Sequence, residues 1–188
     1  MIFVYGYLIY WIVSCVGITY GYHRYFSHRT FRTNSLVEVV LLYLGLLCGG
    51  RSALTWSGVH RMHHAYSDTD RDPHCRNNNA WYVILFSLWR VESIPRKFVK
   101  DLLRNPRVMF FHKYGIYILV AHWIITFLTF GWNAVIINTM LIVLSYLGFG
   151  VLNLFGHDLR GPVNNLWINL LAPLEGNHKD HHEYSQRT

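Results

Sequence analysis

Nine of the twelve histidines in this sequence fall into four short clusters, each beside an apolar stretch. Neutral imidazole is the commonest metal ligand in proteins, and it suits zinc, copper, iron and nickel alike. Nine such side chains are enough to hold two metal ions, so the pattern predicts a metal centre without naming the element. In chain order the clusters are His23 and His28; His60, His63 and His64; His157; and His178, His181 and His182.

The spacing within the clusters is that of ligands on helices. In the second and fourth clusters the histidines are three and four residues apart, and side chains with these offsets project from one face of an α-helix. Each triplet can therefore converge on one metal ion. Asn153 and His157, four residues apart, share a face in the same way. His23 and His28 are five apart, which on an ideal helix separates them by roughly 140°, so we expect them to straddle a helix end or to reach two ions.

The three remaining histidines have different surroundings. His122 stands alone in an apolar run, where we expect a hydrogen-bonded packing residue. His112 lies in a basic segment and is expected to be solvated or near lipid headgroups, whereas His74 is a candidate neighbour of the metal ligands. The three cysteines are scattered without a Cys-x-x-Cys pair, which indicates free thiols rather than a disulfide framework or a zinc ribbon.

The composition predicts an integral membrane protein with an all-α fold. Hydrophobic residues make up 52% of the chain and charged residues 14%, against about 25% charged in ordinary soluble domains. Three uncharged runs, residues 2–20, 114–131 and 134–152, approach the roughly 20 residues that span a bilayer. The first lacks the positive start and the cleavage site of a signal peptide, so we expect a retained anchor. Two shorter apolar stretches, residues 36–48 and 80–89, are expected at the membrane interface or in the protein core.

These spans determine where the histidine clusters lie. The chain crosses the membrane twice between His64 and His157, so all four clusters meet on one face, as the ligands of one centre must. All 17 Lys and Arg residues fall on that same face, which the positive-inside tendency makes cytoplasmic. The net charge of +7 favours anionic headgroups or acidic substrate carriers as partners. Nucleic acid is not expected, because no recognition module is present.

The whole chain, residues 1–188, is expected to form one domain, since it contains no repeat, low-complexity tract or long flexible linker. Residues 94–104 place apolar side chains among basic ones at helical spacing, so they are predicted to form a surface helix on the membrane. The predicted architecture is therefore about three transmembrane helices with additional interfacial helices.

Four segments carry a specific resemblance to a known family. Residues 23–28, 60–64 and 175–182 resemble the three histidine boxes of the membrane-bound acyl-CoA delta-9 desaturases, the stearoyl-CoA desaturase family. Residues 153–157 resemble the Asn-x-x-x-His element of the same family. The four segments occur in the family's order, and the likeness covers most of the chain.

This resemblance implies a cytoplasmic centre of two iron ions (Fe2+) held by the nine histidines, with Asn153 bound through a water molecule. Such enzymes use dioxygen to introduce a cis double bond into a fatty acyl chain, with delta-9 as the expected position. Their two electrons come from a separate redox protein such as cytochrome b5 or ferredoxin, and this sequence agrees because it holds no flavin or nicotinamide glycine fingerprint. The acyl chain would be carried by CoA, by a lipid or by acyl carrier protein.

Acidic residues near the boxes are candidates to orient the ligands. A metal-binding histidine usually donates the hydrogen of its second ring nitrogen to a carboxylate or a carbonyl. The candidates within a few residues of a box are Asp68, Asp70, Asp158, Glu175, Asp180 and Glu183.

The sequence departs from the family pattern in several places. One span precedes the first box where the family has a pair, and the chain stops soon after the last box. Gly58 and Val59 replace an Arg-Asp pair, residues 77–79 replace a basic pair, and Lys179 stands where an asparagine is usual. Since the replaced charges are expected to meet CoA in acyl-CoA enzymes, a lipid or acyl carrier protein stays open as the carrier.

Three other functions are compatible with some of these features. A hydroxylase or related oxidase would use the same histidine boxes and differ in how the substrate lies at the iron. A metal transporter or other non-catalytic metal-binding membrane protein is disfavoured, because transporters place ionisable groups at mid-membrane and the predicted spans hold only His122. An inactive paralogue that keeps its metal is disfavoured by the complete boxes.

Overall fold

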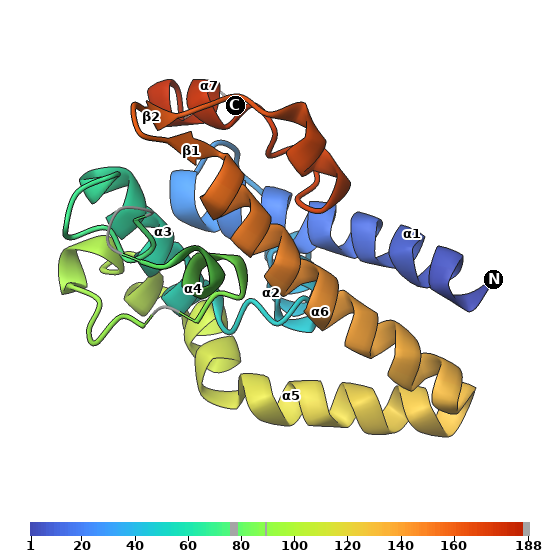
Figure 1. Ribbon diagram of the computed structural model, residues 1–188. Helices are drawn as coiled ribbons and strands as arrows, with labels where there is room; N and C mark the ends of the chain where they lie inside the picture. The colour runs from blue at the N-terminus through green and yellow to red at the C-terminus, as the bar shows by residue number, and fades with distance from the viewer. Residues whose placement is uncertain (76–78, 89, 186–188) are drawn as a thin grey trace.

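The structure is a computed structural model that describes residues 1–75, 79–88 and 90–185. Helices dominate it (Figure 1), and the strands β1 (His157–Asp158) and β2 (Gly161–Pro162) form a short antiparallel pair. The predicted all-α membrane fold is confirmed by this architecture together with the long apolar helices described next.

Within the described residues, three helices are long and apolar enough to cross a membrane. The first consists of α1 (Ile2–Ser14) and a π-helix, η1 (Cys15–His28), which continues it without a break. The others are α5 (Pro106–Phe130) and α6 (Trp132–Phe155). Each predicted apolar run therefore lies on a helix. However, α5 begins at Pro106, before the predicted run 114–131, and the first helix continues to His28, beyond the predicted run 2–20.

The early start of α5 follows from the residues at its N-terminus. The side chain of Asn105 accepts hydrogen bonds from the backbone N–H groups of Arg107 and Val108, and Pro106 occupies the first position, where no hydrogen bond is lost. At the other end Gly131, with a φ of +61°, separates α5 from α6. The two helices diverge from this turn (Figure 1), and α6 runs back across α1.

Two shorter helices, α2 (Ser35–Leu47) and α3 (Ala53–Tyr66), follow the first long helix. Each begins after a residue, Asn34 or Ser52, whose side chain accepts a hydrogen bond from the backbone N–H three positions later. The predicted apolar stretch 36–48 thus forms most of α2. One face of α2 is buried in the protein core, and the other presents exposed apolar side chains.

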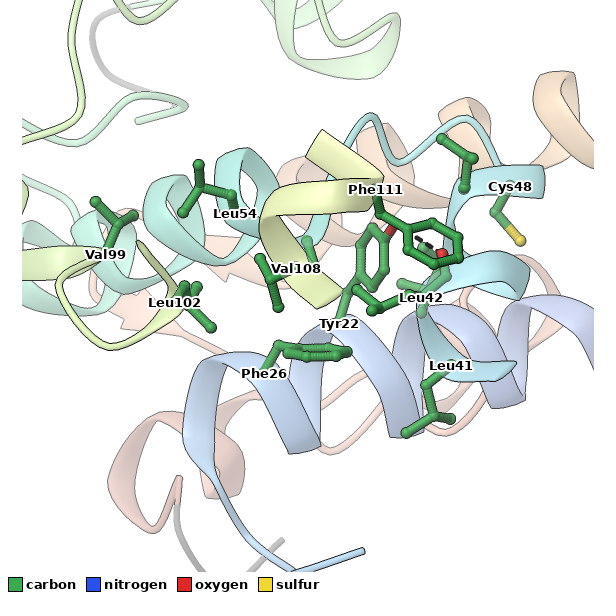
Figure 2. Packing of buried hydrophobic residues seen from close by; sticks show 13 residues of the cluster. Tyr22, Phe26, Leu41, Leu42, Cys48, Leu54, Val99, Leu102, Val108 and Phe111 are labelled. Atoms are coloured by element: carbon green, nitrogen blue, oxygen red, sulfur yellow. Dashed lines mark hydrogen bonds between the residues drawn. The ribbon is translucent and has the colours of Figure 1, made fainter. Parts of the chain in front are cut away.

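The buried core lies where the histidine end of the first helix meets α2, α3 and the start of α5. Figure 2 shows Tyr22 and Phe26 of η1 among Leu42 of α2 and Phe111 of α5. Tyr22 is fully buried, and its hydroxyl donates to the Leu42 carbonyl oxygen at 3.2 Å. Because the first histidine of the chain directly follows Tyr22, this packing fixes the helix that carries it.

Gly45 of α2 permits this packing, because it lies against the ring of Tyr22. A Cβ atom at position 45 would lie 2.3 Å from a ring carbon of Tyr22. We expect Gly45→Ala to lower the free energy of unfolding by about 1–3 kcal/mol through overpacking. This loss outweighs the gain of up to ~1 kcal/mol that alanine brings to a helix interior. Thermal unfolding of the purified protein in detergent measures the change.

Gly115→Ala in α5 is the matched control for this substitution. Its new Cβ atom would meet the end of the flexible Leu46 side chain at 3.3 Å, which can turn away. This variant should unfold at the wild-type temperature or above it. Equal destabilisation by the two substitutions would contradict the role given to Gly45.

Glu38, the acidic residue within the apolar stretch 36–48, is buried with an exposure of 3%. Arg107 donates to its carboxylate at 2.9 Å, and the side-chain amide of Asn105 donates to the other carboxylate oxygen. A buried carboxylate needs such partners to remain charged. The pair therefore ties α2 to the start of α5.

The second short apolar stretch contains a one-turn helix, α4 (Trp81–Leu85), and its last residue, Trp89, lies outside the described residues. Ile84 is buried, while Trp81 and Tyr82 are exposed. The helix packs on α6. These contacts agree with an interfacial segment that has one apolar side on the protein.

The basic segment 94–104 does not form the predicted surface helix. It contains two 3₁₀ turns instead, η2 (Arg96–Phe98) and η3 (Leu102–Arg104). A tertiary contact explains the difference: Arg61 of α3 donates to the carbonyl oxygen of Phe98 at 2.7 Å and to both carboxylate oxygens of Asp101, so both turns are tied to α3. Val99 and Leu102 of the segment lie in the protein core and Ile94 packs against it, whereas Leu103 is exposed.

Candidate metal centre

All nine histidines of the four clusters come together where η1, α3, β1 and a short helix, α7 (His178–Glu183), meet. They form two groups, and within each group the ring nitrogens lie within 4.8 Å of one another. Both groups combine residues from the first 64 positions with residues from the last fifth of the chain. The five-histidine group consists of His23, His28, His60, His64 and His181, and the four-histidine group of His63, His157, His178 and His182.

The expectation that each histidine triplet converges on one metal ion is wrong, because both triplets are divided. In α3, His60 and His64 share the five-histidine group, while His63 joins the other group. In α7, His178 and His182 share the four-histidine group, while His181 joins the five-histidine group. On an α-helix, residues four apart differ in direction by about 40° and adjacent residues by about 100°. The pairs four residues apart therefore stay together, and the third histidine reaches the neighbouring group.

His23 and His28 lie on one helix and in one group, contrary to the expectation that they straddle a helix end or reach two ions. Their ring centroids are 5.0 Å apart. The reason is the π-helical winding of η1, in which hydrogen bonds join residues five apart and bring them onto the same face. Arg29, with a φ of 56°, ends the helix directly after His28.

The Nε2 nitrogens point inward in both groups, and neighbouring Nε2 atoms are 2.8 to 3.2 Å apart. Lone pairs directed at a common point are the arrangement that a metal ion requires. In the five-histidine group the Nε2 separations are 2.8 Å for His23 and His181, 2.8 Å for His28 and His60, and 3.0 Å for His64 and His181. In the four-histidine group they are 3.0 Å for His157 and His178, 3.1 Å for His178 and His182, and 3.2 Å for His63 and His182.

Burial favours the neutral form of several of these rings. Loss of solvation lowers the pKa of His63 to about 3 and that of His182 to about 2, and repulsion between neighbouring imidazolium groups adds to the effect. The same causes lower the pKa values of His60, His64 and His181. A neutral imidazole keeps the lone pair that binds a metal ion, so the groups are ready to bind at pH 7.

Carboxylates hold the outer nitrogens of three of the rings. In each pair the Nδ1–H donates to the carboxylate, which leaves the Nε2 lone pair directed inward and fixes the orientation of the ring. The pairs are His23 with Glu175 at 2.8 Å, His63 with Asp72 at 2.9 Å, and His157 with Asp68 at 3.1 Å.

Two of these carboxylates, Asp68 and Glu175, were among the predicted candidates. Asp72 was missed, although it follows the second box in an acidic turn, and its carboxylate also accepts the backbone N–H of Asp68 at 3.0 Å. That turn places Asp72 behind the ring it supports. The remaining candidates lie elsewhere: Asp158 and Asp180 accept other hydrogen bonds, and Asp70 and Glu183 are exposed.

The three other histidines lie largely where the sequence placed them. The ring of His74 is 4.3 Å from that of His63, beside the four-histidine group. His122 accepts a hydrogen bond from Tyr43 at 2.7 Å and donates to Asn138 at 3.2 Å, so it is the expected packing residue. His112 is exposed and hydrogen-bonded to a serine hydroxyl at 2.8 Å. The three cysteines are free and buried.

A cavity of about 980 Å³ adjoins both histidine groups. This volume is at the upper end of the usual range for ligand sites, about 300–1,000 Å³. Histidines line one part of it, and Ile18, Leu54 and Phe149 line another. Asn153 also borders the cavity, and its water-mediated role at a metal stays a prediction. The cavity can hold a long apolar molecule against the histidines.

Arg61, between two histidines of α3, is a site residue that the sequence did not indicate. All five of its N–H donors are used. They are donated to the backbone oxygens of Phe26, Ser27 and Phe98 and to both carboxylate oxygens of Asp101, at 2.5 to 3.0 Å. Two of these acceptors belong to the last turn of η1, so Arg61 fixes the end of the helix that carries His28.

We expect Arg61→Lys to weaken metal binding by about tenfold, the lower end of the range for residues that support ligands. A lysine ammonium has three donors and lacks the planar fork that reaches three peptide groups and a carboxylate together. Metal content per chain, measured by mass spectrometry after dialysis against a graded chelator, reports the change. Arg104→Lys, at an exposed position, is the matched control. Wild-type metal retention in Arg61→Lys would show that the five hydrogen bonds do not position the ligands.

The fold and the site define a helical protein with candidate membrane spans and a largely buried histidine centre beside a large cavity. This combination is compatible with a membrane-bound metalloenzyme that acts on an apolar substrate. The chain belongs to the fatty acid desaturase family, whose model matches residues 1–187. Desaturases are oxidoreductases.

Individual relatives agree with this family. The chain is 32% identical to the sn-1 stearoyl-lipid 9-desaturase of Anabaena variabilis, over 96% of this chain and 71% of the relative. It is 33% identical to the sn-1 stearoyl-lipid 9-desaturase of Synechocystis, over 95% of this chain and 60% of the relative. It is also 29% identical to the acyl-CoA Delta(11) desaturase of Trichoplusia ni, over 92% and 56% of the two chains. The chain thus spans between about half and three quarters of the length of these relatives.

Proposed function

We propose that this protein is a dioxygen-dependent fatty acyl desaturase that introduces a cis double bond at the delta-9 position of an acyl chain. The observation that carries the proposal is the pair of buried histidine groups, with inward Nε2 atoms, at the wall of a cavity of about 980 Å³. The family and the names of the relatives support the reaction type.

The donor set fits two iron ions. Neutral imidazole suits iron among other metals, and the carboxylates behind three rings hold the tautomer that binding requires. One ion would be held by the five-histidine group and the other by the four-histidine group, with Asn153 reached through a water molecule. When bound, the two ions would supply the activation of dioxygen.

The residues of the chain itself would position the substrate. Apolar side chains along the cavity would bind the acyl chain and exclude water, and the histidine wall would face one stretch of its carbons. Holding reactants in a productive geometry supplies a large part of an enzyme's rate enhancement. The position of the double bond would therefore depend on how far the acyl chain enters the cavity.

We propose that residues 1–188 form one multi-pass domain with the histidines on the cytoplasmic side. The convergence of all four clusters supports a common face, and the turn around Gly131 at the other end of the helices lacks Lys and Arg. Electrons would come from an external donor such as cytochrome b5 or ferredoxin.

A lipid-linked acyl chain is the carrier that we favour over CoA and acyl carrier protein. Two relatives are named for stearoyl-lipid substrates. In addition, Gly58 and Val59 stand where acyl-CoA enzymes of the family carry an Arg-Asp pair. In α3, Gly58 packs against Ile94 and Val99, so this position faces protein and not a charged carrier.

The test is expression in a host that lacks its own desaturase, followed by gas chromatography with mass spectrometry of the total fatty acids. A new monounsaturated acid with its double bond at carbon 9 is the expected product. Separation of the phospholipid, acyl-CoA and acyl carrier protein pools before analysis shows which carrier is modified first. A hydroxy acid would move the assignment to the related oxidase. An unchanged profile from iron-loaded protein supplied with a donor would overturn the proposal.

A further inference from the structure

A loop of ten residues near the C-terminal end, residues 165–174, lies along the first long helix. Its centre is the 3₁₀ helix η4 (Leu166–Leu170). The loop is closed at its base, where the N–H of Asn165 donates to the carbonyl oxygen of Gly176 at 2.7 Å. We call residues 165–174 the α1 loop. It holds none of the histidine motifs, and the proposed reaction does not require it.

The α1 loop is apolar on its outer side. It contains no charged residue in a chain that has 17 Lys and Arg. Trp167 is 79% exposed, and Leu166 and Leu170 are 65% and 55% exposed. Beside it, α1 presents exposed apolar side chains such as Leu8 and Ile12. The two surfaces adjoin, because α1 and the α1 loop are in direct contact.

Side chains of the first helix satisfy the backbone of the α1 loop. Irregular backbone enters hydrocarbon only where its polar groups have protein partners, because water is absent there. The side chains of four residues of the first long helix each donate a hydrogen bond to a carbonyl oxygen of the loop. They are Tyr7 to Leu170 at 2.8 Å, Tyr10 to Leu171, Trp11 to Asn169 at 3.2 Å, and Thr19 to Pro173 at 2.7 Å.

The depth of these contacts places the α1 loop inside the span. The continuous helix Ile2–His28 has 27 residues, more than the roughly 20 that cross a bilayer, so its histidine end projects out of the membrane. Tyr7 lies seven residues before Ser14, about 10 Å further from the histidines than the end of α1. A segment that contacts Tyr7 and Trp11 therefore reaches well into the hydrocarbon.

We propose that the α1 loop is a re-entrant segment, which leaves the histidine side, enters the bilayer beside α1 and returns, with the hydrocarbon of the lipids covering Trp167, Leu166 and Leu170. Leu171, Ala172 and Pro173 on its inner side line the cavity of about 980 Å³. The loop is thus the wall between the membrane and the cavity.

Spin labelling in liposomes tests this proposal. Single cysteines are introduced by Trp167→Cys and Leu170→Cys and carry a nitroxide label, whose collisions with apolar oxygen and with a water-soluble nickel chelate are compared. Leu128→Cys on α5, at a position 78% exposed, is the lipid reference, and Leu159→Cys in the turn between β1 and β2, 87% exposed, is the aqueous reference. The native cysteines are buried, and the unsubstituted protein gives their background labelling.

The expected result is an oxygen-to-nickel ratio at positions 167 and 170 that matches position 128 and exceeds position 159 several-fold. A ratio equal to that at position 159 would overturn the proposal. Protection from both reagents, with magnetic coupling between labels on two molecules, would assign the surface to a second copy of the chain and also overturn it. A nitroxide label on Leu8→Cys reports separately whether α1 lies in the membrane. It thereby distinguishes the outcomes for the α1 loop from a failure of α1 itself to span the membrane.

Discussion

Replacing His63 with alanine is expected to abolish formation of the unsaturated product. His63 belongs to the four-histidine group, where its Nε2 lies 3.2 Å from that of His182, and its Nδ1 is held by Asp72. Loss of a residue that merely supports a ligand costs roughly 10–100-fold in metal affinity or activity, so loss of the ligand should exceed this range. Product formation should fall below detection in the desaturase-deficient host.

The matched control for this substitution is His122→Asn. His122 is also a histidine with two hydrogen-bond partners, but they are Tyr43 and Asn138 between helices, far along the chain from the boxes. We expect this variant to keep its metal and its product. Iron per chain in the purified proteins gives a second readout: about half of the wild-type iron should remain in His63→Ala. Full activity of that variant would exclude the four-histidine group from the reaction.

Introducing phenylalanine at Ser145 is expected to shift the product toward shorter acyl chains. Ser145 is buried, lines the cavity, and lies eight residues before Asn153 on α6, about 12 Å along the helix. A ring at this position would fill the end of the cavity away from the histidines. In a closed apolar pocket each methylene changes the relative rate by roughly 10–200-fold, so the preference between acyl chains two carbons apart should change by at least tenfold.

Val143→Phe serves as the control, because this side chain lies on the same helix but is 49% exposed. It should leave the chain-length profile unchanged. The measurement is the ratio of products in a host supplied with fatty acids of graded length. An unchanged ratio in Ser145→Phe, with normal expression, would show that the acyl chain does not occupy this part of the cavity.

The sequence predicted the members of the histidine centre but not their partition. Offsets of three and four place His60, His63 and His64 on one side of a helix, and this is correct. Which ring joins which group depends on the positions of η1 and α7, which come from distant parts of the chain. Spacing along a helix therefore identifies candidate ligands but cannot assign them to one of two adjacent groups.

Predictions based on local pattern failed where tertiary contacts compete with local preference. The segment 94–104 has the periodicity of a basic amphipathic helix, yet Arg61 ties Phe98 and Asp101 to α3 and the segment forms two 3₁₀ turns. In η1 the π-helical winding that unites His23 and His28 occurs where Tyr22 and Phe26 pack in the core, and the spacing of the histidines alone did not predict it. The lengths of the three long apolar runs predicted membrane-spanning helices more reliably, since each run lies on one of the three long apolar helices.

Each histidine group is completed late in biosynthesis, because its members come from both ends of the chain. His64 is the last histidine of the second cluster, and the next cluster begins at His157, which is 93 positions later (157 minus 64). At 5–20 residues per second, a ribosome needs roughly 5–20 s to make this interval. During that time a nascent chain carries histidines of both groups but completes neither. The proposed metal centre would therefore be completed only after α5 and α6 have been synthesised and the last histidines have emerged, which would make metal loading a late step of biogenesis.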